Sequence, residues 1–141
     1  MLLLAFLSSA CSTKDVQKLE RIDLTQKTMT VPVSSAGLVG KLKTMLREEG
    51  WSLIVYQGPT VTEGTIGSET HTEQQGKFAT RYRLVTTWSH TDGFGWYYDF
   101  SVVIIDNNTG AEALTISGNH GLGANIVKSL RDALLSQSKG P

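Results

Sequence analysis

The chain has 141 residues, 40% of them hydrophobic, which is enough to form the core of one compact domain. Its thirteen Lys and Arg residues are balanced by thirteen Asp and Glu residues, so the formal net charge is zero. Proteins that bind DNA or RNA through the phosphate backbone carry a basic surface. The balanced charge therefore argues against nucleic acid as a partner.

The N-terminus carries a short apolar run, Leu2–Leu7, followed by small residues and then by Cys11, the single cysteine of the chain. This pattern resembles the signal peptide of a bacterial lipoprotein, which is cut before a cysteine that then carries lipid. The resemblance implies a signal peptide over residues 1–10 and lipidation of Cys11. Ser8 stands where such signals usually have leucine, and no Lys or Arg precedes Lys14. The alternative is a frayed apolar N-terminus with a buried structural thiol.

The apolar run is too short to cross a bilayer, which takes about 20 residues. The predicted contact with the membrane is therefore made by acyl chains on Cys11. In lipoproteins of two-membrane bacteria, Asp after the cysteine retains the protein at the inner membrane, whereas Ser12 stands here. The resemblance thus implies the periplasmic face of the outer membrane. The polar residues 11–27 are predicted to comprise the lipidated cysteine and a tether, and residues 28–141 a single domain.

The first part of this domain shows three predicted elements. Residues 28–33 alternate between polar and apolar side chains, which predicts a strand that ends around Pro32. Residues 34–50 place leucines at helical spacing and end in glycine, which predicts an amphipathic helix. The run 51–56 then predicts a second strand.

Residues 58–77 are rich in Gly, Thr, Ser, Glu and Gln and contain few apolar side chains. A stretch of this length without periodicity is uncommon within a compact domain. We predict a mobile loop here. The alternative is a frayed edge strand near residues 60–65.

The C-terminal half predicts an antiparallel meander followed by a helix. Residues 78–90 and 96–104 alternate strongly around a turn at residues 91–95, and a third strand is expected to end at Gly118. A second amphipathic helix is expected around residues 126–134. Alternation places the following side chains of the return strand in the core: Trp96, Tyr98, Phe100, Val102 and Ile104.

The predicted order is β-α-β-β-β-β-α, an α+β fold with a mostly antiparallel sheet of four to five strands and two helices packed on one face. This order, with phrases such as Ile105–Gly110 and Lys128–Leu134, is similar to that of small envelope lipoproteins, including lipopolysaccharide-assembly lipoproteins and auxiliary lipoproteins of transport systems. Both phrases are generic turn and helix sequences. The resemblance therefore implies the fold and the compartment, and transfers no functional residue.

No motif predicts a reaction. The glycine cluster 118–123 lacks the spacing of a phosphate-binding loop and is interpreted as a tight strand-to-helix crossover. The three histidines show no metal-binding spacing, and no Gly-x-Ser-x-Gly motif is present, so we expect no metal, cofactor or catalytic residue. The possible interaction surface consists of Phe94 at the hairpin tip with Tyr97, Arg81 and Arg83. Alternatively, Phe94 folds back onto its own sheet.

The preferred hypothesis is a non-catalytic, lipid-anchored accessory protein that binds an envelope protein through a sheet edge, the hairpin tip or the long loop. The alternative is a small-ligand-binding or hydrolytic periplasmic domain with loop 58–77 as a lid. That alternative requires a pocket where Arg81, Arg83, Asp99 and a histidine converge. A third hypothesis is an intracellular domain in which Cys11 is unmodified.

Overall fold

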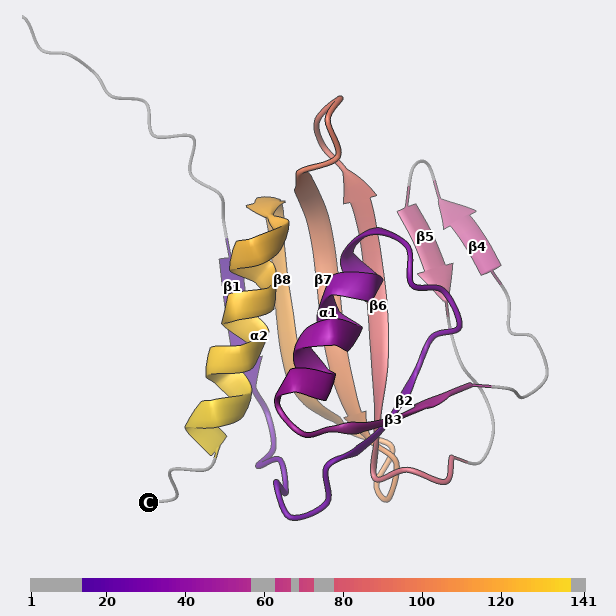
Figure 1. Ribbon diagram of the computed structural model, residues 1–141, viewed down its shortest axis with the longest axis vertical. Coiled ribbons are helices and arrows are strands. Elements are labelled where there is room, and N and C mark those ends of the chain that lie inside the picture. Colours follow the sequence, from indigo (N-terminus) through magenta and orange to yellow (C-terminus); the bar gives the residue numbers. More distant parts are fainter. Residues whose placement is uncertain (1–13, 57–62, 67–68, 73–77, 138–141) are drawn as a thin grey trace, which may run out of the picture.

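Two helices cover one face of a mixed, mostly antiparallel sheet in the computed structural model (Figure 1), which confirms the predicted α+β class. The structure describes residues 14–56, 63–66, 69–72 and 78–137. The elements, in chain order, are β1 (Lys14–Lys18), β2 (Thr28–Val31), α1 (Gly37–Glu48), β3 (Ser52–Val55), β4 (Glu63–Ile66), β5 (Glu69–Thr72), β6 (Tyr82–His90), β7 (Tyr97–Asp106), β8 (Glu112–Leu122) and α2 (Gly123–Gln137).

Six strands lie on one path in the order β1-β8-β7-β6-β2-β3, so the predicted number of four to five is too low. Strands β6, β7 and β8 form the predicted antiparallel meander. Strand β2 runs parallel to both β3 and β6. Helix α1 forms the crossover that the parallel pair of β2 and β3 requires. Strand β5 pairs antiparallel with β6 at Thr70 and Trp88, and β4 pairs with β5.

The additional strand of the path is β1, which lies within residues predicted to be a tether. Its five residues pair antiparallel with β8, from Lys14 opposite Gly118 to Lys18 opposite Leu114. All five side chains are exposed, so neither face of this strand needs to be apolar. The sequence therefore shows no apolar alternation that would predict a strand. Beyond β1, Ile22 is almost fully buried in the core. The ordered fold therefore begins well before residue 28.

The core lies between the helices and the sheet. It contains the leucines of α1, the inward side chains of β6 to β8 and the apolar face of α2. Trp51 packs edge-on against Tyr82 with ring centroids 5.9 Å apart. Lys43 of α1 is also buried, and its ammonium group donates hydrogen bonds to the backbone oxygens of Val33 and Ser34, at 3.3 and 2.7 Å. These hydrogen bonds hold the β2–α1 connection against the helix. Burial lowers the pKa of Lys43.

The end of β8 differs from the predicted crossover. The strand continues through the glycine cluster to Leu122, which pairs with Tyr97, and α2 begins at the next residue. His120 adopts a positive φ of 49° within this stretch. The glycines allow close packing here, because a Cβ atom on Gly121 would lie 2.8 Å from the Phe100 ring.

None of the helices in the described parts of the chain combines the length and apolar character needed to cross a membrane.

Candidate functional site

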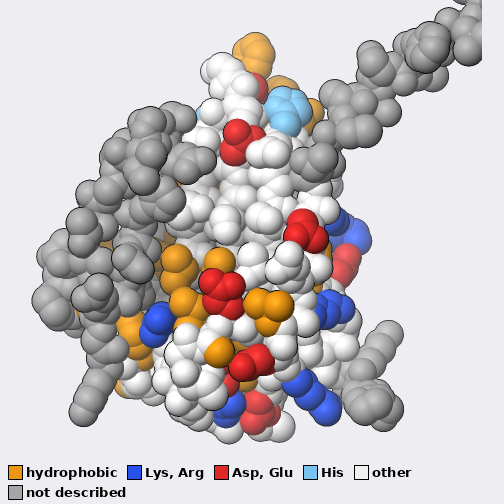
Figure 2. All heavy atoms as spheres, turned by 180° about the vertical axis from the view of Figure 1, so that it is seen from behind, with side chains coloured by type: hydrophobic (Ala, Val, Ile, Leu, Met, Phe, Trp, Pro, Cys, Tyr) orange, Lys and Arg blue, Asp and Glu red, His pale blue; other side chains and the backbone are white. Residues whose placement is uncertain are grey.

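The most exposed aromatic side chains of the described fold lie at the turn between β6 and β7. Phe94 is 79% exposed and Trp96 is 64% exposed, and hydrophobic side chains protrude at this end of the molecule in Figure 2. Their ring centroids are 5.7 Å apart. The prediction that Trp96 belongs to the core is wrong, because β7 begins one residue later, at Tyr97, and its alternation does not extend to Trp96. Phe94 contacts Trp96 rather than folding back onto the sheet.

Hydrogen bonds from the backbone to the Asp92 side chain give this turn a defined shape. The Asp92 carboxylate accepts hydrogen bonds from the backbone N–H groups of Trp96 and Tyr97, both at 3.1 Å. Gly95 has a φ of 74°, which favours glycine. Desolvation of Asp92 is outweighed by these backbone donors, so its pKa is lowered. The carboxylate thus holds the loop that presents the two aromatic rings.

The base of the hairpin is packed with aromatic rings. The His90 ring lies 5.1 Å from that of Trp88 and 4.9 Å from that of Tyr98. On the other side, Tyr97 stacks on His120 with centroids 4.3 Å apart and planes 4° apart. Tyr97 is therefore half-buried and engaged within the fold. Of the aromatic pair predicted as an interaction surface, only Phe94 is freely presented, and Trp96 takes the place of Tyr97.

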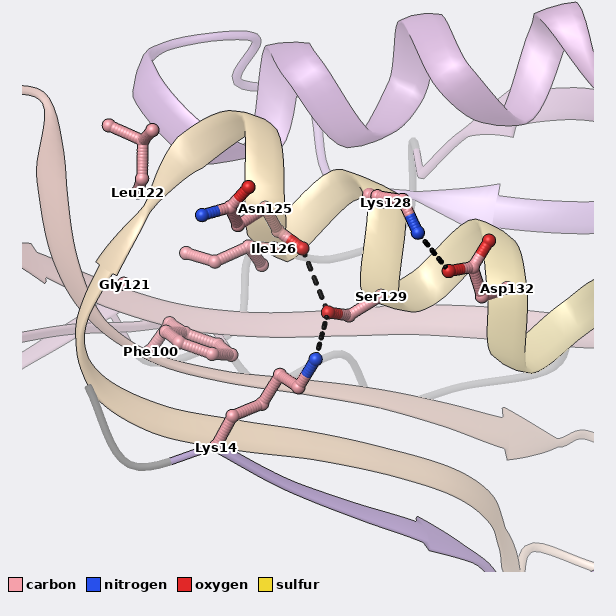
Figure 3. Close-up of a pocket in the computed structure, with 9 residues that line it drawn as sticks. All are labelled: Lys14, Phe100, Gly121, Leu122, Asn125, Ile126, Lys128, Ser129 and Asp132. Carbon is pink, nitrogen blue, oxygen red and sulfur yellow. Dashed lines mark hydrogen bonds and ion pairs between the residues drawn. The ribbon is translucent and has the colours of Figure 1, made fainter. Parts of the chain in front are cut away.

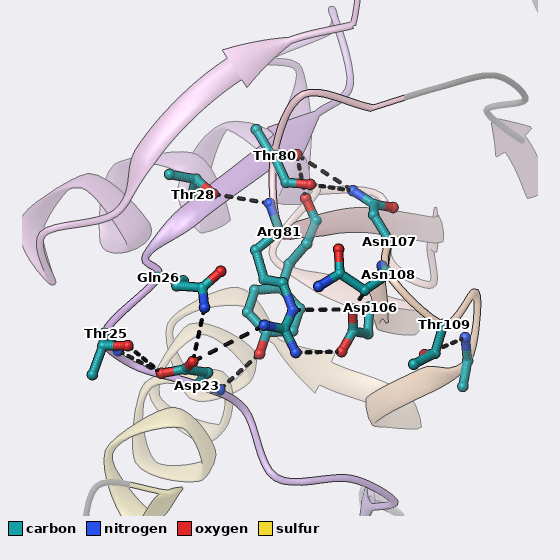
Figure 4. Close-up of polar contacts among 12 residues, drawn as sticks. Asp23, Thr25, Gln26, Thr28, Thr80, Arg81, Asp106, Asn107, Asn108 and Thr109 are labelled. Atoms are coloured by element: carbon teal, nitrogen blue, oxygen red, sulfur yellow. Dashed lines mark hydrogen bonds and ion pairs between the residues drawn. The ribbon is translucent and has the colours of Figure 1, made fainter.

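Arg81 lies at the opposite end of β6, in a polar network (Figure 4). Its guanidinium group donates two hydrogen bonds to the Asp106 carboxylate, at 3.1 and 2.9 Å, and lies 4.0 Å from Asp23. The hydrogen bonds from Arg81 lower the pKa of Asp106, which is 4% exposed. The Tyr82 hydroxyl accepts a hydrogen bond from the backbone N–H of Asp23 at 2.7 Å. Arg81 therefore joins the start of β6 to the end of β7 and is not a free surface cation.

Arg83 is also engaged on the sheet. Its guanidinium carbon lies 4.7 Å from the centroid of the Phe78 ring, and it donates a hydrogen bond to the Asn107 side chain at 3.1 Å. A cation above an aromatic face is stabilised by the ring quadrupole. Both predicted surface arginines thus have structural partners within the fold.

The convergence required by the ligand-binding hypothesis is not formed. Asp99 pairs with Ser89 near the hairpin end of β6, and its carboxylate accepts a hydrogen bond from the backbone N–H of His120 at 2.9 Å. Arg83 and Ser89 are six positions apart along β6, which corresponds to about 20 Å. Asp99 and His120 therefore lie at one end of the sheet, and the two arginines lie at the other.

A cavity of about 340 Å³ lies where β1 and β8 meet α2 (Figure 3). The Lys14 ammonium group donates a hydrogen bond to Ser129 Oγ at 2.8 Å, and Ser129 Oγ donates in turn to the backbone oxygen of Asn125, also at 2.8 Å. Further along β1, Lys18 donates to Ser136 Oγ at 2.5 Å. The hydroxyl proton of Ser129 is donated to the Asn125 carbonyl and not to the Lys14 amine. This arrangement attaches β1 to α2 and does not activate Ser129 as a nucleophile.

The two end strands of the six-strand path, β1 and β3, differ in chemistry. The β1 edge carries Lys14, Asp15, Gln17 and Lys18, the kind of charged sequence that prevents strand addition. The β3 edge has the sequence Ser-Leu-Ile-Val and no charge. Ile54 is 49% exposed there, and no strand of the described chain pairs with the outer side of β3. Sequence analysis named a sheet edge as a possible contact but did not single out Ile54.

The remaining predicted features are only partly described. Within the described residues, no group of three or more His, Cys, Asp or Glu side chains could hold a metal ion. Cys11 lies outside the described residues. The sequence predicts a mobile loop over residues 58–77 or a frayed edge strand near residues 60–65. The structure instead describes the backbone of two strands there, β4 and β5, and the remainder lies outside the described part.

No family model matches this chain, and no curated protein matches it. The fold and its surfaces are therefore the basis for a functional proposal.

Proposed function

We propose that the protein is a non-catalytic, lipid-anchored accessory protein of the bacterial cell envelope that acts by binding another envelope protein. The apolar run ending at Cys11 supports acylation of that cysteine and a position at the periplasmic face of the outer membrane. The short distance in sequence between Cys11 and β1 would hold the domain close to its membrane.

The observation that carries the proposal is the uncharged β3 edge. An apolar edge strand offers unpaired backbone N–H and C=O groups to a strand of another protein, and such edges are normally blocked by charge or covered. On this sheet the β1 edge is charged, whereas β3 is not. Leu53 and Val55 pack against the core, so Ile54 is the exposed apolar side chain that β3 offers to a partner. We therefore propose that the partner adds a β-strand alongside β3.

Photo-crosslinking in intact cells tests the edge. A photoreactive residue at position 54 is expected to yield a discrete adduct with one envelope protein, and the same residue at the exposed Val16 of β1 is expected to yield none. Ile54→Lys should reduce co-purification of that protein at least tenfold, because a lysine at an edge opposes strand addition. The matched variant Val16→Lys should leave it unchanged. Equal losses, or no adduct at position 54, would exclude β3 as the binding edge.

The anchor is tested separately by intact mass. Protein recovered from native membranes should have lost residues 1–10 and should carry acyl chains on Cys11, whereas a Cys11→Ala chain should carry none. A native product that retains Met1 without added lipid would refute the proposed location.

A further inference from the structure

The hairpin tip and the N-terminal end of β1 lie at the same end of the sheet. Lys14 pairs with Gly118, which in turn pairs with Phe100 of β7. Strand β1 then runs away from the hairpin, because Lys18 pairs with Leu114 and Leu114 with Ile104. Figure 1 shows β1 beginning at the end of the sheet from which the β6–β7 hairpin projects. Strand β1 thus begins at the end of the sheet that carries the exposed aromatic tip.

The covalent distance from Cys11 to this point is short. Cys11 precedes Lys14 by three residues, so the two Cα atoms are at most about 11 Å apart in any conformation. Phe100 lies level with Lys14 across the sheet, and β7 begins three residues before it, at Tyr97. The distance along the strand from Phe100 to the start of β7 is about 10 Å. Phe94 and Trp96 lie beyond that, in the turn. A bilayer that holds acyl chains on Cys11 therefore cannot have its surface far beyond the hairpin tip.

The chemistry of the tip suits the interfacial region of a bilayer. Trp and other aromatic side chains are favoured there because an apolar ring meets a polar, hydrated layer. The stretch 91–99 contains Asp92 and Asp99 and no Lys or Arg, so attraction to anionic headgroups would not drive the contact. The backbone of α2 also supports the tip, because the Gly123 N–H donates to the Trp96 carbonyl at 3.2 Å. The two rings are thus held outward before any contact is made.

We propose that the tip of the β6–β7 hairpin is a membrane-contact site, in which Phe94 and Trp96 insert into the lipid interface of the bilayer to which the protein is anchored. This inference rests on the proposed lipid anchor. It gives the domain a fixed orientation, with the tip toward the bilayer. Strand β3 pairs with β2, which pairs with β6 at Tyr82 and Arg83, so the proposed protein-binding edge lies away from the membrane.

Tryptophan quenching by lipid tests the insertion. The full chain is isolated from membranes and reconstituted in phosphatidylcholine vesicles with brominated acyl chains. We expect the bromine atoms to quench the emission of Trp96. The other two tryptophans should contribute little to the quenching, because Trp51 is buried and Trp88 is half-buried in the fold. The quenching should be lost in Trp96→Phe and kept in the control Trp88→Phe. Equal quenching in both variants, or quenching that requires anionic phosphatidylglycerol, would overturn the proposal.

A second measurement removes the anchor. The Cys11→Ala chain is expected to bind phosphatidylcholine vesicles weakly in flotation, and Phe94→Ser or Trp96→Ser should weaken that binding about tenfold each, because each buries less apolar surface. Both side chains are exposed, so the fold should remain intact by circular dichroism. Binding that is unchanged in both variants would contradict the membrane contact.

The outcomes separate this inference from the proposed function. Acylated Cys11 with unquenched Trp96 would overturn the tip contact and leave the anchor standing. Quenched Trp96 in a chain without acyl groups would support the tip contact and refute the anchor. A photoreactive residue at position 94 should form adducts with lipid, and a predominant adduct with a protein would assign the tip to a protein partner and overturn the proposal.

Discussion

At the residue scale, the polar side chains that the sequence suggested as a surface are used to hold the fold together. The Asp106 carboxylate receives two hydrogen bonds from Arg81 and one from the Asn108 backbone N–H at 2.8 Å. A nearly buried carboxylate is stable only with such partners, because removal from water penalises its charge. Simple alternation along β6 predicts that Arg81 faces solvent, and it gives no indication of which carboxylate will meet it.

Replacing Asp106 by Asn should therefore destabilise the protein by about 2 kcal/mol, the usual range for a lost charge-assisted hydrogen bond. Urea unfolding monitored by circular dichroism measures this loss. The control is Asp132→Asn, since Asp132 is exposed and pairs only with Lys128 along α2 in the contacts described. We expect little change in its unfolding midpoint. An equal loss in both variants would show that the network at Asp106 has no special role.

The same carboxylate predicts a pH dependence. Hydrogen bonds from Arg81 lower the pKa of Asp106 in the folded state below its ordinary value of 3.8. Its contribution to stability is thus fully present above that ordinary value and is lost as pH falls through the lower folded-state pKa. Unfolding midpoints measured from about pH 5 to pH 2 should fall more steeply for the wild type than for Asp106→Asn. Parallel curves would contradict this assignment.

At the element scale, helix propensity alone misjudges the start of α1. Glycine is unfavourable inside a helix by roughly 0.5–1 kcal/mol relative to alanine, so sequence reasoning would expect Gly40→Ala to stabilise α1. In the structure, a Cβ atom on Gly40 would lie 2.2 Å from the Ser35 carbonyl oxygen. The segment before α1 folds back over this glycine, and backbone cannot move aside as easily as a side chain.

We therefore expect Gly40→Ala to destabilise the protein by about 1–3 kcal/mol, the cost of overpacking, despite the better helix propensity of alanine. Thr44→Ala, one turn later on the exposed side of the same helix, is the matched control and should be neutral or slightly stabilising. Thermal unfolding distinguishes the two variants. A rise in the melting temperature of Gly40→Ala would show that the close approach of Ser35 is not maintained.

At the scale of the whole molecule, the sheet is unevenly stabilised. Strand β7 pairs with β6 and β8 along most of its length, whereas β1 pairs with β8 alone and exposes all five side chains. Few buried contacts mean a low free energy of local opening. Because β1 directly follows the proposed anchor, the strand nearest to Cys11 in the sequence is less well packed than the central strand β7.

Hydrogen exchange followed by mass spectrometry should show this difference. The β7 amides are expected to exchange only through global unfolding, and the β1 amides through local opening at rates at least a hundredfold faster. Lys14→Ala should raise β1 exchange further, because it removes the hydrogen bond to Ser129, and should leave β7 unaffected. If β1 and β7 exchanged at the same rate, the edge strand would be part of the central cooperative unit.

The sequence by itself determined the α+β class, the two amphipathic helices and the meander, because each depends on local periodicity that burial of one face imposes. It could not predict β1, whose side chains are all exposed and whose pairing depends on a partner about a hundred residues away. Only the tertiary structure decided that Trp96 is exposed, that Arg81 is paired, and that the aromatic tip lies at the end where β1 begins. Those outcomes depend on where strands end and which residues they meet, and such long-range pairing leaves no periodic signal in the chain.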